Sequence, residues 1–215
     1  MSSGIIILWD GRKWKAVDRS VGEYSVPTLL ECRQTGWKWA CSSVYGPHED
    51  AWREHLWEEI SNICISWEAP WLVVGDFNVT RFPEDCNRPR PITPGMTRFS
   101  SWIDGEGLID LPVGNQVFTW SNLREEPSLA RLDRVLMDSE WKAKFPGCEV
   151  VPLPRVVSDH VPLLLKEGGA AHVPVCFCFE AWWLSVEGFS EVVMESWSAD
   201  TGALQGGQRL AFKLK

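Results

Sequence analysis

Two polar residues follow a run of apolar ones in the segment 71–79, which reads Trp-Leu-Val-Val-Gly-Asp-Phe-Asn-Val. A short apolar run of this kind predicts a strand buried on both faces, and Gly75 at its end permits a sharp turn or a close approach. Asp76 and Asn78 are two residues apart, so on extended backbone their side chains face the same side. A carboxylate beside an amide at the end of a buried strand suits a hard cation and a phosphate oxygen. The alternative is a plain Asx turn that ends the strand.

Three further groups of polar residues lie at or near the ends of predicted strands: Tyr45, Asp133 and the pair Asp159-His160. A buried aspartate can accept a hydrogen bond from one ring nitrogen of a histidine, which fixes the tautomer and raises the basicity of the ring. If the strand ends converge, Asp133 could serve His160 in this way. The four groups together would then form a site for proton transfer and phosphate binding.

Each of these residues also has a simpler structural explanation. Tyr45 could be a core or edge tyrosine, and Asp133 could pair with Arg131 or Arg134. The Asp159-His160 pair could lie in a solvated turn before the next proline. The sequence alone leaves these alternatives open.

The first part of the chain is predicted to be strand and turn. Residues 4–9 and 13–18 read as a hairpin joined at Asp10-Gly11, and residues 25–34 and 37–44 read as a second antiparallel pair. A helix capped by Asp50 follows, with apolar residues at intervals of three and four up to position 67. The buried strand 71–79 comes directly after this helix, which is typical of α/β folds.

The next part alternates loops with short elements. Residues 81–95 form a proline-rich loop whose arginines (Arg81, Arg88 and Arg90) could contact DNA phosphates or lie on a solvated surface. The remaining predicted elements are a helix at 97–104, strands at 117–122 and 131–137, a helix capped by Asp138 or Ser139, an extended segment at 150–157 and an apolar run at 161–165. A change of composition at 167–171 predicts a domain at residues 1–166 followed by a helical linker at 167–215.

The composition sets further limits. The net charge of −8 argues against strong non-specific binding to a nucleic-acid backbone, although an acidic active site is compatible with it. The seven cysteines are odd in number and scattered, which favours a reduced, intracellular protein. No apolar run reaches the roughly 20 residues that span a bilayer, so we expect no membrane partner. No feature indicates a small-molecule cofactor or an oligomeric state.

The order of the motifs resembles the endonuclease/exonuclease/phosphatase superfamily. These motifs are Tyr-Gly-Pro, Gly-Asp-Phe-Asn, Phe-Thr-Trp-Ser-Asn, Arg-Leu-Asp-Arg and Ser-Asp-His-x-Pro, starting at residues 45, 75, 118, 131 and 158. The resemblance is closest to the apurinic-type endonuclease domain of plant LINE retrotransposons, on Leu153-Pro154-Arg155 and on the stretch 179–183. It implies a four-layer α/β sandwich of two packed mixed sheets flanked by helices.

The resemblance also implies Mg²⁺-dependent cleavage of a phosphodiester by an in-line water, with Mn²⁺ as an alternative ion and DNA as the partner. Asp76 would orient or deprotonate the water, and Asn78 would hold a phosphate oxygen. His160, oriented by Asp133, would contact the scissile phosphate. The further implied roles are a phosphate contact for Tyr45, a metal contact for Asp159 and a place on the nucleic-acid side for Thr119. A nuclear location is suggested by the resemblance alone.

The sequence departs from the family pattern at its start. Family members open with a strand carrying an asparagine and a second strand ending in Gln-Glu, and that glutamate is a principal metal ligand. Residues 2–4 resemble the segment just after it, so we expect a domain that lacks the first strands, with weak or no nuclease activity. The alternatives are a non-catalytic remnant of the domain and a phosphatase of the same superfamily.

Overall fold

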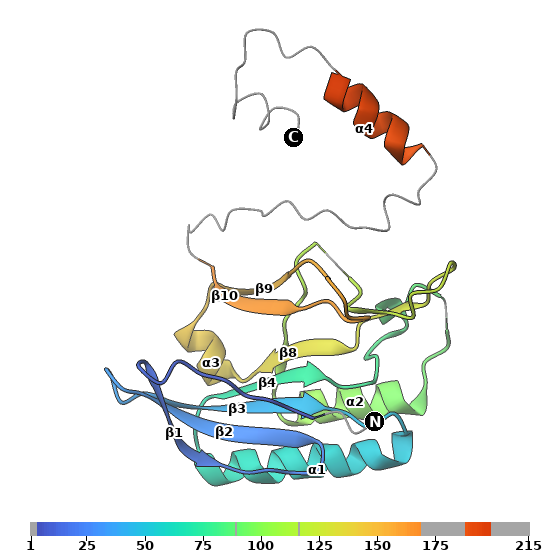
Figure 1. Cartoon of the computed structure of the whole chain (residues 1–215). Coiled ribbons are helices and arrows are strands. Elements are labelled where there is room, and N and C mark those ends of the chain that lie inside the picture. The colour runs from blue at the N-terminus through green and yellow to red at the C-terminus, as the bar shows by residue number, and fades with distance from the viewer. Residues whose placement is uncertain (1–3, 89, 116, 169–187, 199–215) are drawn as a thin grey trace, which may run out of the picture. The chain divides into compact units, whose positions relative to one another are not determined.

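The computed structural model describes residues 4–88, 90–115, 117–168 and 188–198. The chain divides into two compact units, Met1–Ala171 and His172–Lys215 (Figure 1). Within the second unit the described element is the helix α4 (Phe189–Ser198). Of the linker predicted at 167–215, residues 169–187 and 199–215 lie outside the described residues, and Glu167 ends a strand rather than starting a linker. The boundary expected at residue 166 stays a prediction. None of the helices in the described ranges is long and apolar enough to cross a membrane.

The first unit is built on a six-stranded mixed sheet with the order β1-β2-β3-β4-β8-β5. Its strands are β1 (Trp14–Arg19), β2 (Ser25–Cys32), β3 (Lys38–Tyr45), β4 (Trp71–Asp76), β5 (Ile109–Asp110) and β8 (Asp133–Met137). Two smaller sheets pair β9 (Cys148–Pro152) with β10 (Leu163–Glu167), and β6 (Trp120–Ser121) with β7 (Leu129–Ala130). The helices of this unit are α1 (Asp50–Trp67), α2 (Pro94–Gly105) and α3 (Ser139–Lys144), with a 3₁₀ turn at Pro83–Asp85.

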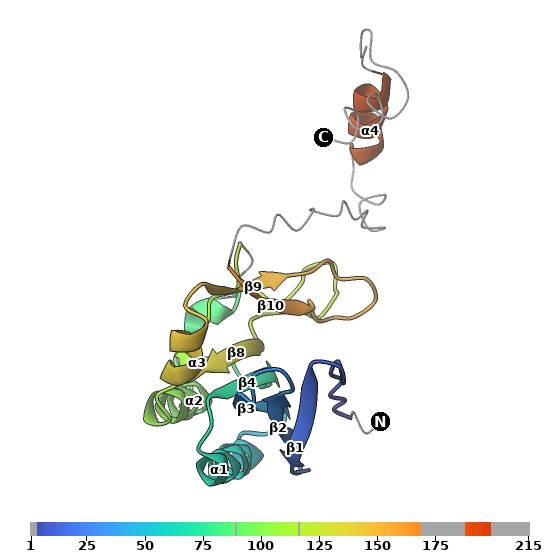
Figure 2. The same ribbon diagram turned by 90° about the vertical axis from the view of Figure 1, so that its left-hand side faces the viewer.

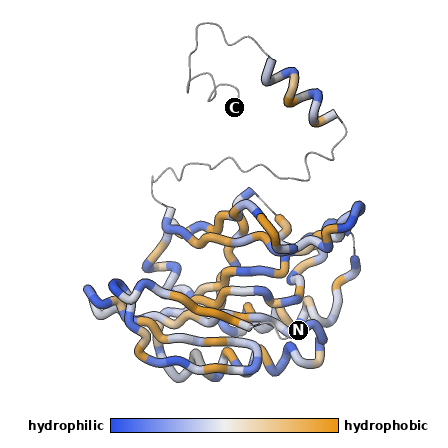
Figure 3. The backbone as a smooth tube through the Cα atoms, in the orientation of Figure 1, coloured by the Kyte–Doolittle hydropathy of each residue, from blue (hydrophilic) through white to orange (hydrophobic). Residues whose placement is uncertain are grey.

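Strand β4 lies inside the large sheet, parallel to β3 and antiparallel to β8. Its side chains alternate between the two faces: Trp71 and Val73 join one apolar cluster, and Leu72 joins the other. Both faces are therefore buried, which is why this strand reads as a continuous apolar run rather than an alternating one. The prediction of a strand buried on both faces is confirmed for residues 71–76. Figure 3 shows hydrophobic segments, coloured orange, along the backbone of the large sheet.

Helices α1 and α2 cover one face of the large sheet, as Figure 2 shows. Leu56 and Ile60 of α1 and Phe99 and Ile103 of α2 are fully buried in the cluster that contains Val73. These residues repeat at intervals of four along their helices, so each helix turns one apolar face toward the sheet. This packing buries one face of the large sheet.

The opposite face packs against β9 and β10. Val135 and Met137 of β8 lie with Cys148 and Val150 of β9 in the second apolar cluster, and Trp141 of α3 closes its far end. The predicted α/β class, with packed sheets flanked by helices, is thus confirmed. The two faces differ in cover, with helices on one and a small sheet on the other.

The N-terminal hairpin prediction is wrong. Residues 4–9 form no strand, and Ile6 and Leu8 are exposed. The carboxylate of Asp10 accepts a hydrogen bond from the backbone of Arg12, and its carbonyl oxygen accepts from Lys13 and Trp14, so the chain makes a helix-like turn. Strand β1 therefore leaves this turn to pair with β2.

Two smaller expectations also need correction. The α1 helix begins with Glu49 as its N-cap, without a side-chain cap, and Asp50 pairs with Arg53 inside the first turn. The strands predicted at 117–122 and 131–137 are shorter, at 120–121 and 133–137. The cap of α3 is as predicted, because Asp138 accepts a hydrogen bond from the backbone of Trp141 at 2.7 Å.

Gly75 cannot be replaced without moving the neighbouring strand. Its φ is +142°, and a Cβ there would lie 2.0 Å from the carbonyl oxygen of Val44. We expect Gly75→Ala to lower the free energy of unfolding by about 3 kcal/mol or more, from backbone strain and overpacking together. Gly36→Ala is the control, because Gly36 has a φ of +70° but no atom within 4 Å of the added Cβ. It should cost about 1–2 kcal/mol, and equal costs in chemical denaturation would contradict this account.

Candidate active site

Three neighbouring strands end in one row of polar residues. Tyr45 of β3 is the register partner of Asp76 of β4, which is in turn the partner of Asp133 of β8. Register partners in a sheet project to the same face, so these side chains share the face that carries Leu72 and Val135. The row lies where β3 and β4 leave the core, as the sequence predicts.

His160 reaches this row from the segment between β9 and β10. Its Nδ1 lies 2.8 Å from Oδ2 of Asp133, and its Nε2 lies 3.8 Å from Oδ2 of Asp76. The imidazole therefore stands between two carboxylates from adjacent strands. The predicted pairing of His160 with Asp133 is what the structure shows, and the alternative ion pairs of Asp133 with Arg131 or Arg134 are not.

The surroundings raise the pKa of both His160 and Asp76, for different reasons. The hydrogen bond to Asp133 raises the pKa of His160, against the effect of partial burial, and the charge of Asp76 acts in the same direction. Burial raises the pKa of Asp76, while a hydrogen bond from the backbone of Asn78 lowers it. The arrangement thus favours a protonated imidazole that can donate from Nε2, beside a carboxyl group of increased basicity.

Asn78 does not lie on extended backbone. Its φ is +51°, its backbone N–H donates to Oδ1 of Asp76 at 2.8 Å, and its Nδ2 donates to the carbonyl oxygen of Gly46 at 2.7 Å. The Asx turn and the placement of Asn78 beside Asp76 therefore occur together, whereas the sequence presented them as alternatives. The turn ties the end of β4 to the end of β3.

Asp159 lies outside the row. Its Oδ2 accepts a hydrogen bond from the indole Nε1 of Trp120 at 3.0 Å, which keeps the pKa of this exposed carboxyl group low. The predicted metal contact is therefore not with the same group of side chains as Asp76 and Asp133. Trp120 was missed by the sequence analysis, although its place directly after Thr119 could have drawn attention to it.

Thr119 is fully buried, so it does not line the nucleic-acid side as expected. Its hydroxyl oxygen accepts hydrogen bonds from the backbone N–H groups of Leu132 and Asp133, both at 3.0 Å. A buried hydroxyl that accepts hydrogen bonds from two backbone amides supports a site from the core and does not line its surface. This contact is a correction to the predicted role.

Two hollows flank the row. One, of about 570 Å³, lies between β8 and β10 with Asp133 and His160 among its lining residues. The other, of about 450 Å³, is lined by Tyr45 together with Gly46 and His48. Tyr45 is 36% exposed and stands on the opposite side of Asp76 from Asp133, in a separate hollow from His160.

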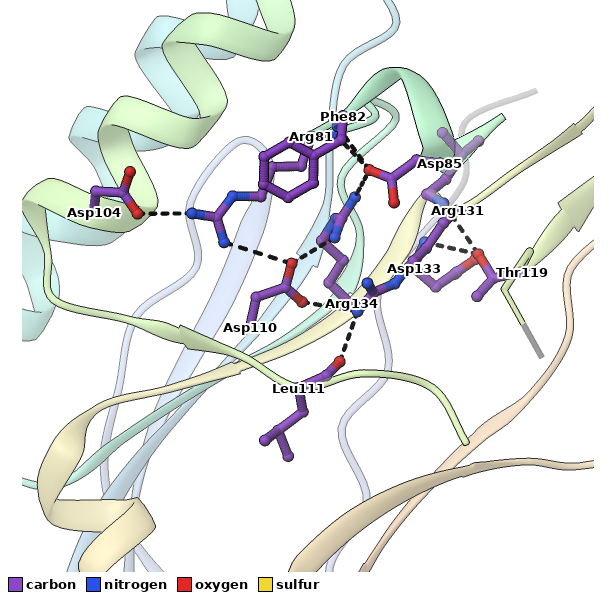
Figure 4. Close-up of polar contacts among 11 residues, drawn as sticks. Arg81, Phe82, Asp85, Asp104, Asp110, Leu111, Thr119, Arg131, Asp133 and Arg134 are labelled. Carbon is purple, nitrogen blue, oxygen red and sulfur yellow. Dashed lines mark hydrogen bonds and ion pairs between the residues drawn. The ribbon is translucent and has the colours of Figure 1, made fainter. Parts of the chain in front are cut away.

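A network of buried charges lies under β8, and the sequence analysis missed it (Figure 4). The guanidinium of Arg134, whose side chain is 0% exposed, binds Asp85 and Asp110. Arg131 also binds Asp110, at 2.8 Å, and Arg81 binds Asp104 at 2.7 Å. Arg81 also lies 3.7 Å from the carboxylate of Asp110, and its backbone N–H donates to Asp85, so it belongs to this network and not to a DNA-facing or solvated loop. The signal in the sequence was Asp110, a charged residue within the apolar segment 108–113.

The side chains present fit a divalent cation. Among the residues that the structure describes, Asp76, Asp133 and His160 form the group whose ligand atoms lie within 4.8 Å of one another. Mg²⁺ commonly binds proteins through one or two carboxylates, with waters and substrate phosphate completing its shell. Each carboxylate has one oxygen engaged, Oδ2 of Asp133 by His160 and Oδ1 of Asp76 by the backbone of Asn78, so each has its other oxygen to offer an ion.

A mixed sheet between helices and a smaller sheet, with acidic residues at its strand ends, defines an α/β sandwich domain. The chain belongs to the endonuclease/exonuclease/phosphatase family, whose model matches residues 5–160. No curated protein sequence matches the chain significantly.

Solved structures share the fold at low sequence identity. The endonuclease domain of TRAS1, a telomere-specific non-LTR retrotransposon, is 16% identical with a TM-score of 0.53, over 67% of this chain and 64% of that domain. An endonuclease/exonuclease/phosphatase family protein from Bacteroides thetaiotaomicron is 14% identical with a TM-score of 0.51, over 73% and 66%. The catalytic domain of Xenopus laevis APE2 is 19% identical with a TM-score of 0.50, over 66% and 55%. The chain thus spans less than two thirds of the length of each.

The raised pKa of His160 predicts a pH-dependent stability. A histidine whose pKa is higher in the folded state stabilises the fold fully below its unfolded pKa of about 6.5, and this contribution is lost as the pH rises through the folded pKa. We expect His160→Gln to lower the free energy of unfolding more at pH 6 than at pH 8.5, when both are measured in the presence of a chelator that removes divalent cations. Chemical denaturation of both proteins across this range measures the difference. A gap that widens toward high pH would contradict the assigned contact with Asp133.

Proposed function

We propose that this domain hydrolyses phosphodiester bonds in DNA with the help of Mg²⁺, or of Mn²⁺ in its place. The observation that carries the proposal is the position of His160 between Asp76 and Asp133 at the ends of adjacent strands. A histidine oriented by one carboxylate and facing another is suited to phosphate binding and proton transfer. Membership of a family named for nucleases and phosphatases supports the same class of reaction.

The proposed role of each side chain follows from the atoms that its hydrogen bonds leave unoccupied. His160 donates from Nε2 to an oxygen of the scissile phosphate, because its Nδ1 is bound to Asp133. Asp76 orients the attacking water and accepts its proton, which suits a carboxyl group whose pKa burial has raised. Asn78 contacts a phosphate oxygen with its second amide hydrogen, since the first is bound to Gly46. Tyr45 donates its hydroxyl to the phosphate from the other side of the row.

When bound, a divalent cation would offset the negative charge that builds up on the phosphate as the water attacks and the ester P–O bond to the leaving oxygen breaks. Asp76 would hold the ion together with phosphate oxygens and water. Asp159, kept ionised by its hydrogen bond from Trp120, would contribute negative charge from outside the group. Because Asp76 and Asp133 each have one carboxylate oxygen engaged, binding of the ion is expected to be weak, and so is the activity.

Within the family we place the domain in the retrotransposon endonuclease branch, and on its motifs in the plant LINE group. The motifs Phe-Thr-Trp at 118–120 and Leu-Pro-Arg at 153–155 support this placement. The similarity of fold to the TRAS1 endonuclease domain agrees with it. The expectation that the first strands of the domain lie outside this sequence stays a prediction.

Asp76→Ala and His160→Ala should each remove the activity. We expect the unaltered protein to nick supercoiled plasmid slowly in Mg²⁺, and each substitution to lower the rate by about 100-fold or more, because the water and the phosphate lose their partners. Conversion of supercoiled to open-circular plasmid gives the rate.

His55→Ala and Glu140→Ala are the matched controls, because both side chains are exposed on helices outside the row. They should nick at the unaltered rate. Nicking that persists in Asp76→Ala would show a contaminating nuclease or a different site. A complete lack of nicking in the unaltered protein, at high Mg²⁺ and Mn²⁺, would favour the non-catalytic remnant.

A pair of small substrates separates the diesterase from the phosphatase alternative. We expect hydrolysis of bis(p-nitrophenyl) phosphate, a diester, to exceed hydrolysis of p-nitrophenyl phosphate, a monoester, and both to stop on removal of the metal with a chelator. Release of p-nitrophenolate measures both reactions, and addition of Mg²⁺ should restore them. A preference for the monoester that disappears in His160→Ala would overturn the proposed substrate class.

A further inference from the structure

Thr119 makes hydrogen bonds to the backbone of Asp133 and to the backbone of the residue after His160. Its hydroxyl oxygen accepts from the backbone N–H of Asp133 at 3.0 Å (Figure 4). Its carbonyl oxygen accepts from the backbone N–H of Val161, the residue after His160, at 2.7 Å. One buried residue therefore sets the separation of two segments that lie 27 positions apart in the sequence.

The peptide that enters β8 is held from two sides. The N–H groups of Leu132 and Asp133 both donate to the Thr119 hydroxyl, and the carbonyl oxygen of Leu132 accepts from the backbone of Phe77 at 3.0 Å. A serine or threonine oxygen can accept two hydrogen bonds, so this geometry uses its full capacity. The backbone of Asp133 is left little freedom to shift away from His160.

Arg134 holds the same strand from the opposite face. Successive residues of a strand point to opposite faces, so fixing the side chain of Arg134 also fixes the direction of Asp133. Its guanidinium is bound at both ends, to Asp85 and to Asp110, and lies 5.5 Å from the ring centre of Phe99. The strand is thus held by a hydroxyl on one side and by an ion network on the other.

We propose that Thr119 is a positioning residue that directs the carboxylate of Asp133 at Nδ1 of His160, with Arg134 bracing the strand from beneath. The catalytic part of this inference rests on the proposed function, whereas the hydrogen bond between the two side chains does not. A loss of the hydroxyl would leave the buried site assembled but the imidazole less firmly oriented. A shift of an ångström in such a pair can cost up to about 100-fold in rate.

Thr119→Val and Thr119→Ser test the role of the hydroxyl. The valine keeps the shape and removes the acceptor, so we expect kcat for plasmid nicking or diester hydrolysis to fall by about 10–100-fold while KM changes little. The serine keeps the oxygen and should recover most of the rate. Thr28→Val is the matched control, because Thr28 is a threonine that is 2% exposed and lies in β2, which pairs with β1 and β3 and not with β4 or β8.

A readout independent of activity is the NMR signal of the Nδ1 proton of His160. Held by Asp133, this proton should be protected from exchange and shifted downfield in the unaltered protein, in Thr119→Ser and in Thr28→Val. It should be lost or move upfield in Thr119→Val, and in Asp133→Ala as the reference. Thr119→Ala, which removes the acceptor without a second methyl, serves if the valine variant does not fold.

The two readouts separate the two proposals. If the proton signal is kept in Thr119→Ser and lost in Thr119→Val, but the unaltered protein shows no hydrolysis, the positioning role stands and the proposed function fails. If Thr119→Val keeps the unaltered signal and matches Thr28→Val in kcat, Thr119 is an ordinary buried threonine and the positioning role is refuted.

Discussion

The site depends on the register of β4 between its two neighbours. The parallel pairing with β3 and the antiparallel pairing with β8 bring Tyr45, Asp76 and Asp133 into one row. A slip of one residue in β8 would move Asp133 to the helix-covered face and bring Arg134 to the site. The chemistry at the row is therefore only as well defined as the hydrogen-bond ladder between these strands.

Buried charge explains how that register is held. A buried arginine with two aspartates adds little net stability compared with apolar residues of the same shape, because each charge loses its hydration. It does make wrong arrangements costly, since a shifted β8 would leave Arg134 without Asp85 and Asp110 in an apolar interior. The network under the sheet thus contributes to a unique alignment more than to overall stability, and Thr119 separately holds the backbone at the start of β8.

The sequence was sufficient to identify the residues that gather at the site, but not the interactions that hold them in place. Asp76 and Asp133 could be placed at strand ends from local patterns, and the motif order supplied His160. Asn78 was misjudged because a left-handed residue after a strand breaks the alternation of sides. Arg134 and Thr119 were missed or misassigned because their partners lie 49 and 13–14 positions away, and no local pattern reports such contacts. The strand predicted at residues 4–9 failed for a similar reason, since an apolar run before a turn signal does not show whether a partner strand is available.

The same hydrogen bond that orients His160 also limits the metal chemistry proposed for the row. Asp133 gives one carboxylate oxygen to the imidazole, so it has less negative charge to offer a cation. Asp76 likewise gives one oxygen to the backbone N–H of Asn78, so the row would be a weak ligand set for Mg²⁺, an ion that keeps most of its waters unless phosphate oxygens replace them. Ion and nucleic acid would then bind interdependently, each raising the affinity for the other by the same factor. A site built in this way would hold a metal ion firmly only when the phosphate is present.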